Sequence, residues 1–425
     1  MFPIFCIFSY NLQIDLPECE QMNIDDQVQI LMKGTEYGDE ELKRAMTEEL
    51  RQRLIEAEKE KRPLRVYCGY DPRTTDLHLG HTITMRKLRQ FQDLGHEVYF
   101  IVGTYTSLIG DPSDKDRLRA QLTPEQAEHN ARTYAEQAFR VLDKQKTKVR
   151  YNAEWLSKLT FADLIKLASN FTIQQFLTRE NFKLRWENGD AVYLHETFYS
   201  LMQGYDAYEL RADVQVGGTD QLFNILTAAR KIMAFMGEKP NIGIIMGILP
   251  GTDGVVRMSK SLGNHIPLNT TPEDMYGKVM SLPDFAMGQY FRLITRWSVS
   301  EIEAIEHSMD TGELHPRDVK MQLAREIVEI FFGPEDAGQA EETFVRVFQQ
   351  GNQPDEIPVF KLQPGQSILD VMMNGKLVGS KSEGRRLIEQ KGVRLDGNLV
   401  TDPNQSFPHT GVLQAGKRRF LRVID

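Results

Sequence analysis

The sequence predicts an α/β protein whose main domain is a doubly wound parallel sheet, followed by an α-helical region and a small basic module at the C-terminus. Three observations predict this architecture. Short apolar, β-prone runs alternate with segments of helical periodicity, as in a parallel sheet that helices cover on both faces. A segment rich in proline and glycine, residues 351–366, then resembles a linker. The C-terminal end is basic, whereas the rest of the chain is acidic.

Each predicted strand is a short run of apolar residues that stops at a turn signal, most often glycine. The strands predicted in this way are residues 64–70, 97–103, 213–221 and 241–251. Around them, apolar residues recur at helical spacing, as Met85, Leu88 and Phe91 do. The helices predicted in this way cover residues 22–62 and 78–94, most of 123–212, and 272–349.

Composition excludes several classes of protein. Of the 425 residues, 41% are hydrophobic, which is enough to fill a core, and 26% are charged, so disordered and fibrous classes do not fit. No stretch approaches the roughly 20 apolar residues that a membrane helix needs. The three cysteines, Cys6, Cys19 and Cys68, suit neither a disulfide framework nor a zinc site, which favours a cytoplasmic protein.

The first 21 residues differ from the rest of the chain. They contain a short apolar run, Phe5–Phe8, but neither a basic start nor a small-residue cleavage site, so a signal peptide is not expected. We interpret them as an extension and expect the chain proper to begin near Met22.

Charge is distributed unevenly along the chain. Residues 361–425 carry 11 Lys and Arg against 6 Asp and Glu, a net charge of +5, which leaves −14 for the remainder of a chain whose total is −9. A basic terminal module on an acidic body favours contact between that module and a polyanion. Charge alone leaves open the alternative that the module merely has a solvated basic face.

Two short segments carry residues suited to chemistry. The first is His78-Leu79-Gly80-His81, which follows a predicted strand and opens a predicted helix. A helix N-terminus offers free N–H groups to phosphate oxygens, and Gly80 allows a base or ribose to approach closely. The two histidines, three residues apart, share one face of the helix. Taken alone, the segment fits equally well two ordinary helix-start histidines or half of a metal site.

The second segment is Arg257-Met258-Ser259-Lys260-Ser261, in a predicted loop flanked by Gly254 and Gly263. Lys260 can neutralise charge that develops on a phosphate chain, and the glycines allow the loop to close. By itself, a basic loop rich in serine is usually only a solvated loop.

Together these segments resemble the two signatures of class I aminoacyl-tRNA synthetases, usually called HIGH and KMSKS, which here read HLGH and RMSKS. The pair is far more specific than either half, because a lone HxGH also occurs in small nucleotidyltransferases. Further segments resemble the bacterial-type tyrosyl-tRNA synthetase family, namely Tyr67–Pro72, Thr106–Ser113, Tyr199–Leu210 and Gln215–Gln221. Residues 367–397 resemble an S4-type RNA-binding domain, and the whole resemblance covers nearly all of Met22–Asp425.

The resemblance implies a Rossmann-type fold for the catalytic domain, a small α+β fold for the C-terminal domain, and a division of the chain into parts. The implied parts are residues 1–62 as an extension and helical lead-in, 63–265 as a Rossmann-type catalytic domain with a helical insertion, 266–350 as an α-helical domain, 351–366 as a linker and 367–425 as an S4-like domain. The resemblance also implies a homodimer, formed through the helical insertion around residues 150–200.

The implied reaction joins L-tyrosine and ATP into tyrosyl-adenylate and pyrophosphate, and then transfers the tyrosyl group to the 3′-terminal adenosine of tRNA-Tyr. ATP is a substrate accompanied by Mg²⁺, and we expect no dedicated metal site in the protein. The substrate carboxylate itself attacks the α-phosphate, so no covalent nucleophile is needed. Catalysis would therefore come from alignment and from placed charge.

For tyrosine, the resemblance implies a phenol-binding pair and an ammonium-binding set. Tyr67 and Asp206 would hydrogen-bond the phenol hydroxyl, and phenylalanine would leave them unsatisfied. Asp111, Tyr199 and Gln203 would hold the α-ammonium group. Residues 199, 203 and 206 are spaced i, i+4 and i+7, so one helix can present all three. Core packing is the alternative for that face, but Gln and Asp are poor core residues without partners.

The remaining candidates surround ATP and the reacting carboxylate. Gln221 would lie near the tyrosine carboxylate. The ribose would be lined by Cys68, His81, Thr84 and Asp220, with close backbone approach at Gly80 and Gly218. The departing pyrophosphate would contact His78, Ser259 and Lys260.

In the terminal module, the implied tRNA contacts are the basic side chains Lys381, Arg385, Arg386, Lys391 and Arg394. Two positions elsewhere depart from the family pattern. Arg73 stands where threonine is common, and Arg257 stands where the loop signature usually has lysine, so charge is kept there while geometry changes.

Two rival functions fit parts of the sequence. A tryptophanyl-type synthetase would share the fold, but not the Tyr67 and Asp206 pair or the S4-like tail. A non-catalytic RNA-binding protein on the same scaffold would be expected to lose signature residues, whereas this chain keeps His78, His81 and Lys260.

Overall fold

The structure, a computed structural model, describes residues 22–72, 77–112, 130, 134–349, 357–363, 365–408, 410–416 and 419–424. The extension before Met22 and the unusual Arg73 lie outside the described residues. The chain divides into two compact units, of which the first comprises residues 1–270 and 278–331 and the second residues 271–277 and 332–425.

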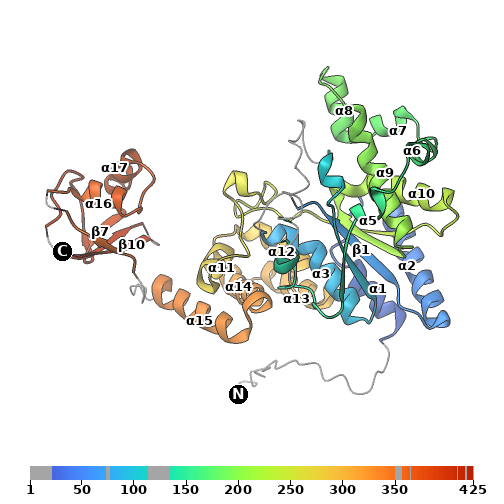
Figure 1. The fold of residues 1–425 in the computed structure, drawn as a ribbon. Helices are drawn as coiled ribbons and strands as arrows, with labels where there is room; N and C mark the ends of the chain where they lie inside the picture. The colour runs from blue at the N-terminus through green and yellow to red at the C-terminus, as the bar shows by residue number, and fades with distance from the viewer. Residues whose placement is uncertain are drawn as a thin grey trace, which may run out of the picture. The chain divides into compact units, whose positions relative to one another are not determined.

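The first unit is built on a parallel sheet, which confirms the predicted fold class (Figure 1). Its strands are β1 (Arg65–Tyr70), β2 (Glu97–Val102), β3 (Thr147–Tyr151), β4 (Val214–Gly218) and β5 (Ile242–Met246). They lie side by side in the order β3-β2-β1-β4-β5, so the chain winds outward from β1 in one direction and from β4 in the other. Such sheets bind ligands at the carboxyl ends of the strands where the winding reverses, which here is between β1 and β4.

Helices pack against this sheet and fix its edges. The helix after β1 contacts β1, β2 and β4, and the long helix before β1 contacts β5. The long helix begins where the side chain of Asp39 accepts a hydrogen bond from the Leu42 N–H over 2.8 Å, which satisfies one free donor of the first turn. Among the described residues, the α-helices of the first unit are α1 (Ile24–Met32), α2 (Glu40–Glu60), α3 (Leu79–Asp93), α5 (Ala153–Leu156), α6 (Phe161–Ala168), α7 (Ile173–Leu177), α8 (Glu180–Glu187), α9 (Leu194–Glu209), α10 (Arg230–Phe235), α12 (Met287–Leu293), α13 (Val299–Asp310) and α14 (Pro316–Phe332). One further helix, α11 (Pro272–Met280), begins in the second unit.

Two predicted helical segments of the first unit differ in the structure. Residues 22–62 form two helices rather than one, because Gly34 and Gly38 between them adopt φ of 74° and 69°, which a helix cannot contain. The stretch 123–212 contains β3, which the sequence did not predict. This edge strand has no apolar run, since Lys148 and Arg150 alternate along it.

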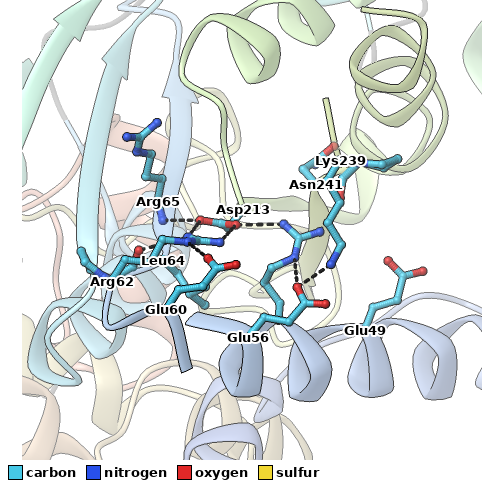
Figure 2. A network of polar contacts seen from close by, with 12 residues as sticks. Glu49, Glu56, Glu60, Arg62, Leu64, Arg65, Asp213, Lys239 and Asn241 are labelled. Carbon is cyan, nitrogen blue, oxygen red and sulfur yellow. Dashed lines mark hydrogen bonds and ion pairs between the residues drawn. The ribbon is translucent and has the colours of Figure 1, made fainter. Parts of the chain in front are cut away.

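The amino end of β4 carries a buried ion-pair network centred on Asp213 (Figure 2). Its carboxylate accepts hydrogen bonds from Arg53 over 2.9 Å, from Arg62 over 2.8 Å and from the backbone N–H of Arg65 over 2.9 Å. Burial alone would raise the pKa of Asp213, but these bonds outweigh it and hold the pKa below its ordinary value of 3.8. The network therefore connects α2 and the segment that follows it to the amino end of β4, at the opposite end of the strand from the cavity.

We expect Asp213→Ala to lower the free energy of unfolding by about 3–5 kcal/mol, because it leaves the buried Arg53 guanidinium without its carboxylate. Urea unfolding followed by circular dichroism measures this change. Glu60→Ala is the matched control: this carboxylate pairs with Arg62 but is 58% exposed, so its removal costs about 0–1 kcal/mol. Since the folded pKa is depressed, the contribution of Asp213 is present above pH 4 and is lost as the pH falls further. Equal effects of both variants would contradict the prediction.

The second unit contains a mixed sheet beside short helices. Its strands are β6 (Val359–Lys361), β7 (Val393–Leu395), β8 (Asn398–Leu399), β9 (Gly411–Ala415) and β10 (Arg419–Ile424), in the spatial order β6-β10-β9-β7-β8. Its helices are α15 (Pro334–Phe344), α16 (Ile368–Asn374) and α17 (Lys381–Glu389). A core that includes Ile368, Met372 and Leu413, all fully buried, holds the C-terminal sheet and helices together.

The compact units do not follow two of the predicted boundaries. The sequence predicted a separate helical domain over residues 266–350, but residues 278–331 of this range belong to the same compact unit as the parallel sheet. One reason is that α12 contacts the segment that follows β5. The buried Tyr290 hydroxyl, for example, donates to the backbone oxygen of Pro250 over 2.7 Å. The predicted linker also contains β6, which pairs in parallel with β10. Within the described part of the chain, the helices are too short or too polar for any to cross a membrane.

Candidate active site

A cavity of about 1200 Å³ lies at the carboxyl ends of β1 and β4, where the winding of the sheet reverses. The start of α3, one face of α9 and the loop around residue 260 complete its wall. Every residue that the resemblance assigns to tyrosine or ATP lines this cavity, namely Tyr67, Cys68, His78, Gly80, His81, Thr84, Asp111, Tyr199, Gln203, Asp206, Gly218, Asp220, Gln221, Ser259 and Lys260.

The start of α3 places His78 and His81 against each other. Their ring centroids lie 3.8 Å apart, and the backbone N–H of His78 donates to Nδ1 of His81 over 3.2 Å. Burial, reinforced by neighbouring histidine and arginine side chains, lowers the pKa of His78 to about 3, and burial lowers that of His81 to about 4. Both rings are therefore neutral at pH 7, and Nε2 of His81 carries its proton. They can donate hydrogen bonds to ligand oxygens but supply no positive charge.

One face of α9 presents Tyr199, Gln203 and Asp206 to the cavity. The Tyr199 hydroxyl donates to Oδ2 of Asp71 over 3.2 Å. The hydroxyl of Tyr67, a side chain 1% exposed, donates to the backbone oxygen of Gln203 over 3.3 Å. Oε1 of Gln203 is buried and has no hydrogen-bond partner among the described residues, so it can accept an N–H from a ligand.

Asp206 is a buried carboxylate, 4% exposed, on this face of α9. Nε1 of Trp155 donates to one of its oxygens over 2.7 Å, and Nδ2 of Asn152 donates to the other over 3.3 Å. Burial raises the pKa of Asp206 to about 7, against the lowering effect of these two hydrogen bonds. A carboxyl group that titrates near neutral pH inside a cavity is typical of a functional site.

The carboxyl end of β4 is closely packed and lies beside Asp111. Gly217 has no room for a side chain, because a Cβ there would lie 2.5 Å from Cδ1 of Ile225. Just beyond it, Nε2 of Gln221 donates to Oδ2 of Asp111 over 2.5 Å. On the α3 side, the Thr84 hydroxyl shares a hydrogen bond of 2.9 Å with Tyr70.

The loop that carries Lys260 is held by Asn264, a residue that sequence reasoning missed. Oδ1 of Asn264 accepts from the backbone N–H of Ser259 over 2.8 Å. Its Nδ2 donates to Oδ2 of Asp253 over 2.5 Å and to the backbone oxygen of Arg257 over 3.2 Å. One buried amide thus fixes the backbone of the loop, while Lys260 remains exposed at the edge of the cavity.

The basic candidates of the second unit lie on α17, in the turn that follows it and on β7. All of them are exposed, namely Lys381, Arg385, Arg386, Lys391 and Arg394. Lys381 pairs with Asp370 over 2.8 Å, and Arg394 donates to the backbone oxygen of Gly397 over 2.9 Å. These cations are therefore accessible to a polyanion.

Sequence reasoning also missed Asp71, Asn152 and Trp155. Asp71 directly follows β1, and the position of a carboxylate at the carboxyl end of a strand could have identified it. Asn152 and Trp155 follow β3, the strand that the sequence did not predict, so no signal pointed to their place in the sheet.

Comparisons of sequence identify the family to which the chain belongs. A family model described as "tRNA synthetases class I (W and Y)" matches residues 59–349, and a model described as "S4 domain" matches residues 369–407. The tyrosine–tRNA ligase of Moorella thermoacetica is 47% identical over 379 residues, which cover 88% of this chain and 92% of the relative. Tyrosine–tRNA ligase 2 of Clostridium acetobutylicum is 42% identical over 403 residues, or 95% of this chain and 99% of the relative.

Solved structures share the fold. The tyrosyl-tRNA synthetase of Archaeoglobus fulgidus complexed with L-tyrosine has a TM-score of 0.58 at 22% identity, over 75% of this chain and 100% of that one. A C-terminally truncated mitochondrial tyrosyl-tRNA synthetase of Aspergillus nidulans has a TM-score of 0.60 at 22% identity, over 78% and 96%. Those likenesses establish the fold alone, and the sequence matches go further: the chain belongs to the class I tRNA synthetases of the tryptophan and tyrosine group, and within that group to the tyrosine–tRNA ligase family.

Proposed function

We propose that this chain activates L-tyrosine with ATP, releasing pyrophosphate, and transfers the tyrosyl group from the adenylate to the 3′-terminal adenosine of tRNA-Tyr. The observation that carries this proposal is the buried pair of Tyr67 and Asp206 in the cavity. Burial and the nearby Asp206 charge raise the pKa of Tyr67, so its hydroxyl remains protonated. A phenol hydroxyl can exchange hydrogen bonds with both groups, whereas a phenyl ring leaves them unsatisfied.

The same cavity suits the α-amino and carboxylate groups of tyrosine. Asp111 supplies negative charge, and Tyr199 and Gln203 supply oxygen acceptors for the ammonium group. The unpartnered Oε1 of Gln203 supports this role, because a buried acceptor without a donor costs free energy until a ligand provides one. Gln221, whose Nε2 donates to Asp111, would meet the substrate carboxylate.

In the activation step, a tyrosine carboxylate oxygen bonds to the α-phosphorus of ATP. The bond from that phosphorus to the bridging oxygen breaks, and its electron pair leaves with pyrophosphate. Lys260 would neutralise charge on the leaving group, while the neutral His78 and His81 and the Ser259 hydroxyl would donate hydrogen bonds. Cys68, Thr84 and Asp220 would line the ribose, with Gly80 and Gly218 allowing close backbone approach.

Mg²⁺ would arrive with ATP, held by phosphate oxygens. The part of the chain that the structure describes contains no group of three or more His, Cys, Asp or Glu side chains placed to hold a metal ion. The protein would contribute hydrogen bonds and Lys260 to the triphosphate.

The second unit would bind the tRNA through the exposed cations on and after α17. Its match to the S4 domain supports this role. A tyrosine–tRNA ligase acts in the compartment where its tRNA receives tyrosine. The small number of cysteines, three in this chain, fits the cytoplasm.

We also propose that two copies of the chain associate through helices α6–α9. Large apolar side chains are exposed there, including Phe161 at 78%, Trp186 at 64% and Leu194 at 65%. Apolar side chains gathered in this way typically mark a protein interface. Analytical ultracentrifugation should give twice the chain mass, and Trp186→Glu should lower it. Ile55→Glu, on α2, is the exposed apolar control and should not change the mass.

A tyrosine-dependent ATP–pyrophosphate exchange assay across amino acids tests the function directly. Exchange with tyrosine, and with neither tryptophan nor phenylalanine at equal concentration, is the expected result. Exchange that prefers tryptophan would favour the rival synthetase. No exchange with any amino acid would favour the non-catalytic RNA-binding protein.

The raised pKa of Asp206 predicts a pH dependence of tyrosine use. Because the carboxylate must be ionised to accept the phenol O–H, kcat/KM for tyrosine should fall about tenfold per pH unit below pH 7. The two site histidines do not contribute, since they titrate near 3 and 4. Exchange kinetics from pH 8 to pH 6 measure the profile, and Asp206→Asn should lower kcat/KM and flatten it. A flat wild-type profile would refute the role.

A further inference from the structure

A chain of hydrogen bonds runs from α8 through the protein interior to Asp111. Nη1 of Arg179 donates to the Ser200 hydroxyl over 2.9 Å, and that hydroxyl donates to Oδ1 of Asn224 over 2.7 Å. Nδ2 of Asn224 donates to Oε1 of Gln221 over 3.0 Å, and Nε2 of Gln221 donates to Oδ2 of Asp111 over 2.5 Å. The last two residues line the cavity, whereas the first three do not.

The direction of each hydrogen bond in this series follows from the groups at its two ends. A guanidinium group has only donors, so the Ser200 oxygen must accept from Arg179 and turn its own proton toward Asn224. Asn224 then presents its carbonyl to Ser200 and its NH₂ to Gln221. Gln221 in turn presents its carbonyl to Asn224 and its NH₂ to Asp111, a carboxylate that can only accept. Each amide therefore has one permitted orientation.

The interior positions keep this order rigid. Ser200 and Asn224 are both 0% exposed, so water cannot replace a missing partner. Arg179 is 6% exposed and lies over the rings of Phe182, at 4.7 Å from the centroid, and Phe223, at 5.3 Å. The aromatic faces favour the guanidinium at that place. The cation that sets the order is thus itself fixed by packing.

We propose that Arg179, Ser200 and Asn224 are positioning residues that hold the Gln221 amide in one orientation and, through it, aim the Asp111 carboxylate at the α-ammonium of the substrate. The inference rests on the proposed role of the cavity in binding tyrosine. If Gln221 were reversed, its carbonyl would face Oδ2 of Asp111 and repel it. Tyrosine would therefore bind more weakly if the amide were reversed, and we call this series of hydrogen bonds the relay.

Asn224→Asp tests the relay with almost no change in shape. The new carboxylate oxygen requires a donor from Gln221, which must reverse and turn its carbonyl to Asp111. We expect KM for tyrosine in pyrophosphate exchange to rise about 10–100-fold, the range for a hydrogen bond to a charged group. The inhibition constant of 4-ethylphenol, which lacks both the ammonium and the carboxylate that Gln221 is proposed to meet, should change less than about threefold, within the context-dependence of such contributions. An unchanged KM, or equal losses for both ligands, would overturn the proposal.

A second pair of variants covers the case in which Asn224→Asp does not fold. Arg179→Lys keeps a cationic donor to Ser200 and should retain most of the affinity for tyrosine, whereas Arg179→Met removes the donor and should lower it. Equal KM values for these two folded variants would overturn the relay. Failure of the underlying function is seen separately, as an absence of tyrosine-dependent exchange in the wild-type protein.

Discussion

Lys260→Ala should slow the formation of tyrosyl-adenylate by 10²–10³-fold while tyrosine still binds. Lys260 is exposed at the edge of the cavity, on a loop whose backbone is fixed at Ser259 by Asn264. Its charge can stabilise the departing pyrophosphate only when ATP is bound, so its loss affects the transition state rather than the complex with tyrosine. Removing one such contact raises the barrier by about 3–4 kcal/mol. Single-turnover measurements at saturating ATP give the rate.

Two controls make this experiment specific. Equilibrium dialysis should show the same dissociation constant for tyrosine in the wild type and the variant. Lys158→Ala removes an exposed lysine of the first unit that does not line the cavity, and should leave the rate unchanged. An unaltered single-turnover rate in Lys260→Ala would refute the proposed role.

A chain that ends at residue 350 should keep tyrosine-dependent pyrophosphate exchange nearly intact and lose most of its ability to charge tRNA. The cavity lies wholly within the first unit, so removing residues 351–425 takes away none of its lining. It does remove the exposed cations on and after α17. Each phosphate contact contributes about 0.9 to the slope of log affinity against log salt concentration. The loss of several contacts should therefore lower tRNA affinity by at least about 100-fold and flatten the salt dependence.

A full-length variant separates tRNA binding from stability. Arg385→Gln combined with Arg386→Gln keeps the second unit folded, because both side chains are exposed on α17. Charging measured at two salt concentrations should fall in this variant, with a smaller salt effect than in the wild type. If exchange and charging fell together in the truncated chain, with a lowered melting temperature, residues 367–425 would be stabilising the fold rather than binding tRNA.

The signatures made much of the site predictable. The HLGH and RMSKS segments and the spacing of Tyr199, Gln203 and Asp206 depend on local sequence, and residues on one turn or one helical face stay neighbours in any fold that keeps the helix. Local spacing does not bring separate segments together, however, and only the family resemblance predicted that all candidates for tyrosine and ATP would line one cavity.

The unpredicted residues depend on contacts between distant parts of the chain. β3 is an edge strand in which every second residue is charged. It forms a strand because it pairs with β2, and its sequence lacks the apolar run that would have predicted one. With β3 unrecognised, Asn152 and Trp155 had no predictable place beside Asp206. β6 is similar, since its three residues become a strand only by pairing with β10.

The neutral state of the two site histidines has a consequence for the electrostatic potential of the cavity. Among the described residues of its lining, positive charge resides on Arg257 and Lys260, both in one loop, and four aspartates oppose it. The empty cavity is thus an unfavourable place for a polyphosphate unless cations accompany it. The positive potential that a triphosphate meets is therefore confined to one loop, whose backbone Asn264 holds at Arg257 and Ser259. The affinity for the nucleotide would then depend on the cations in solution as much as on the protein.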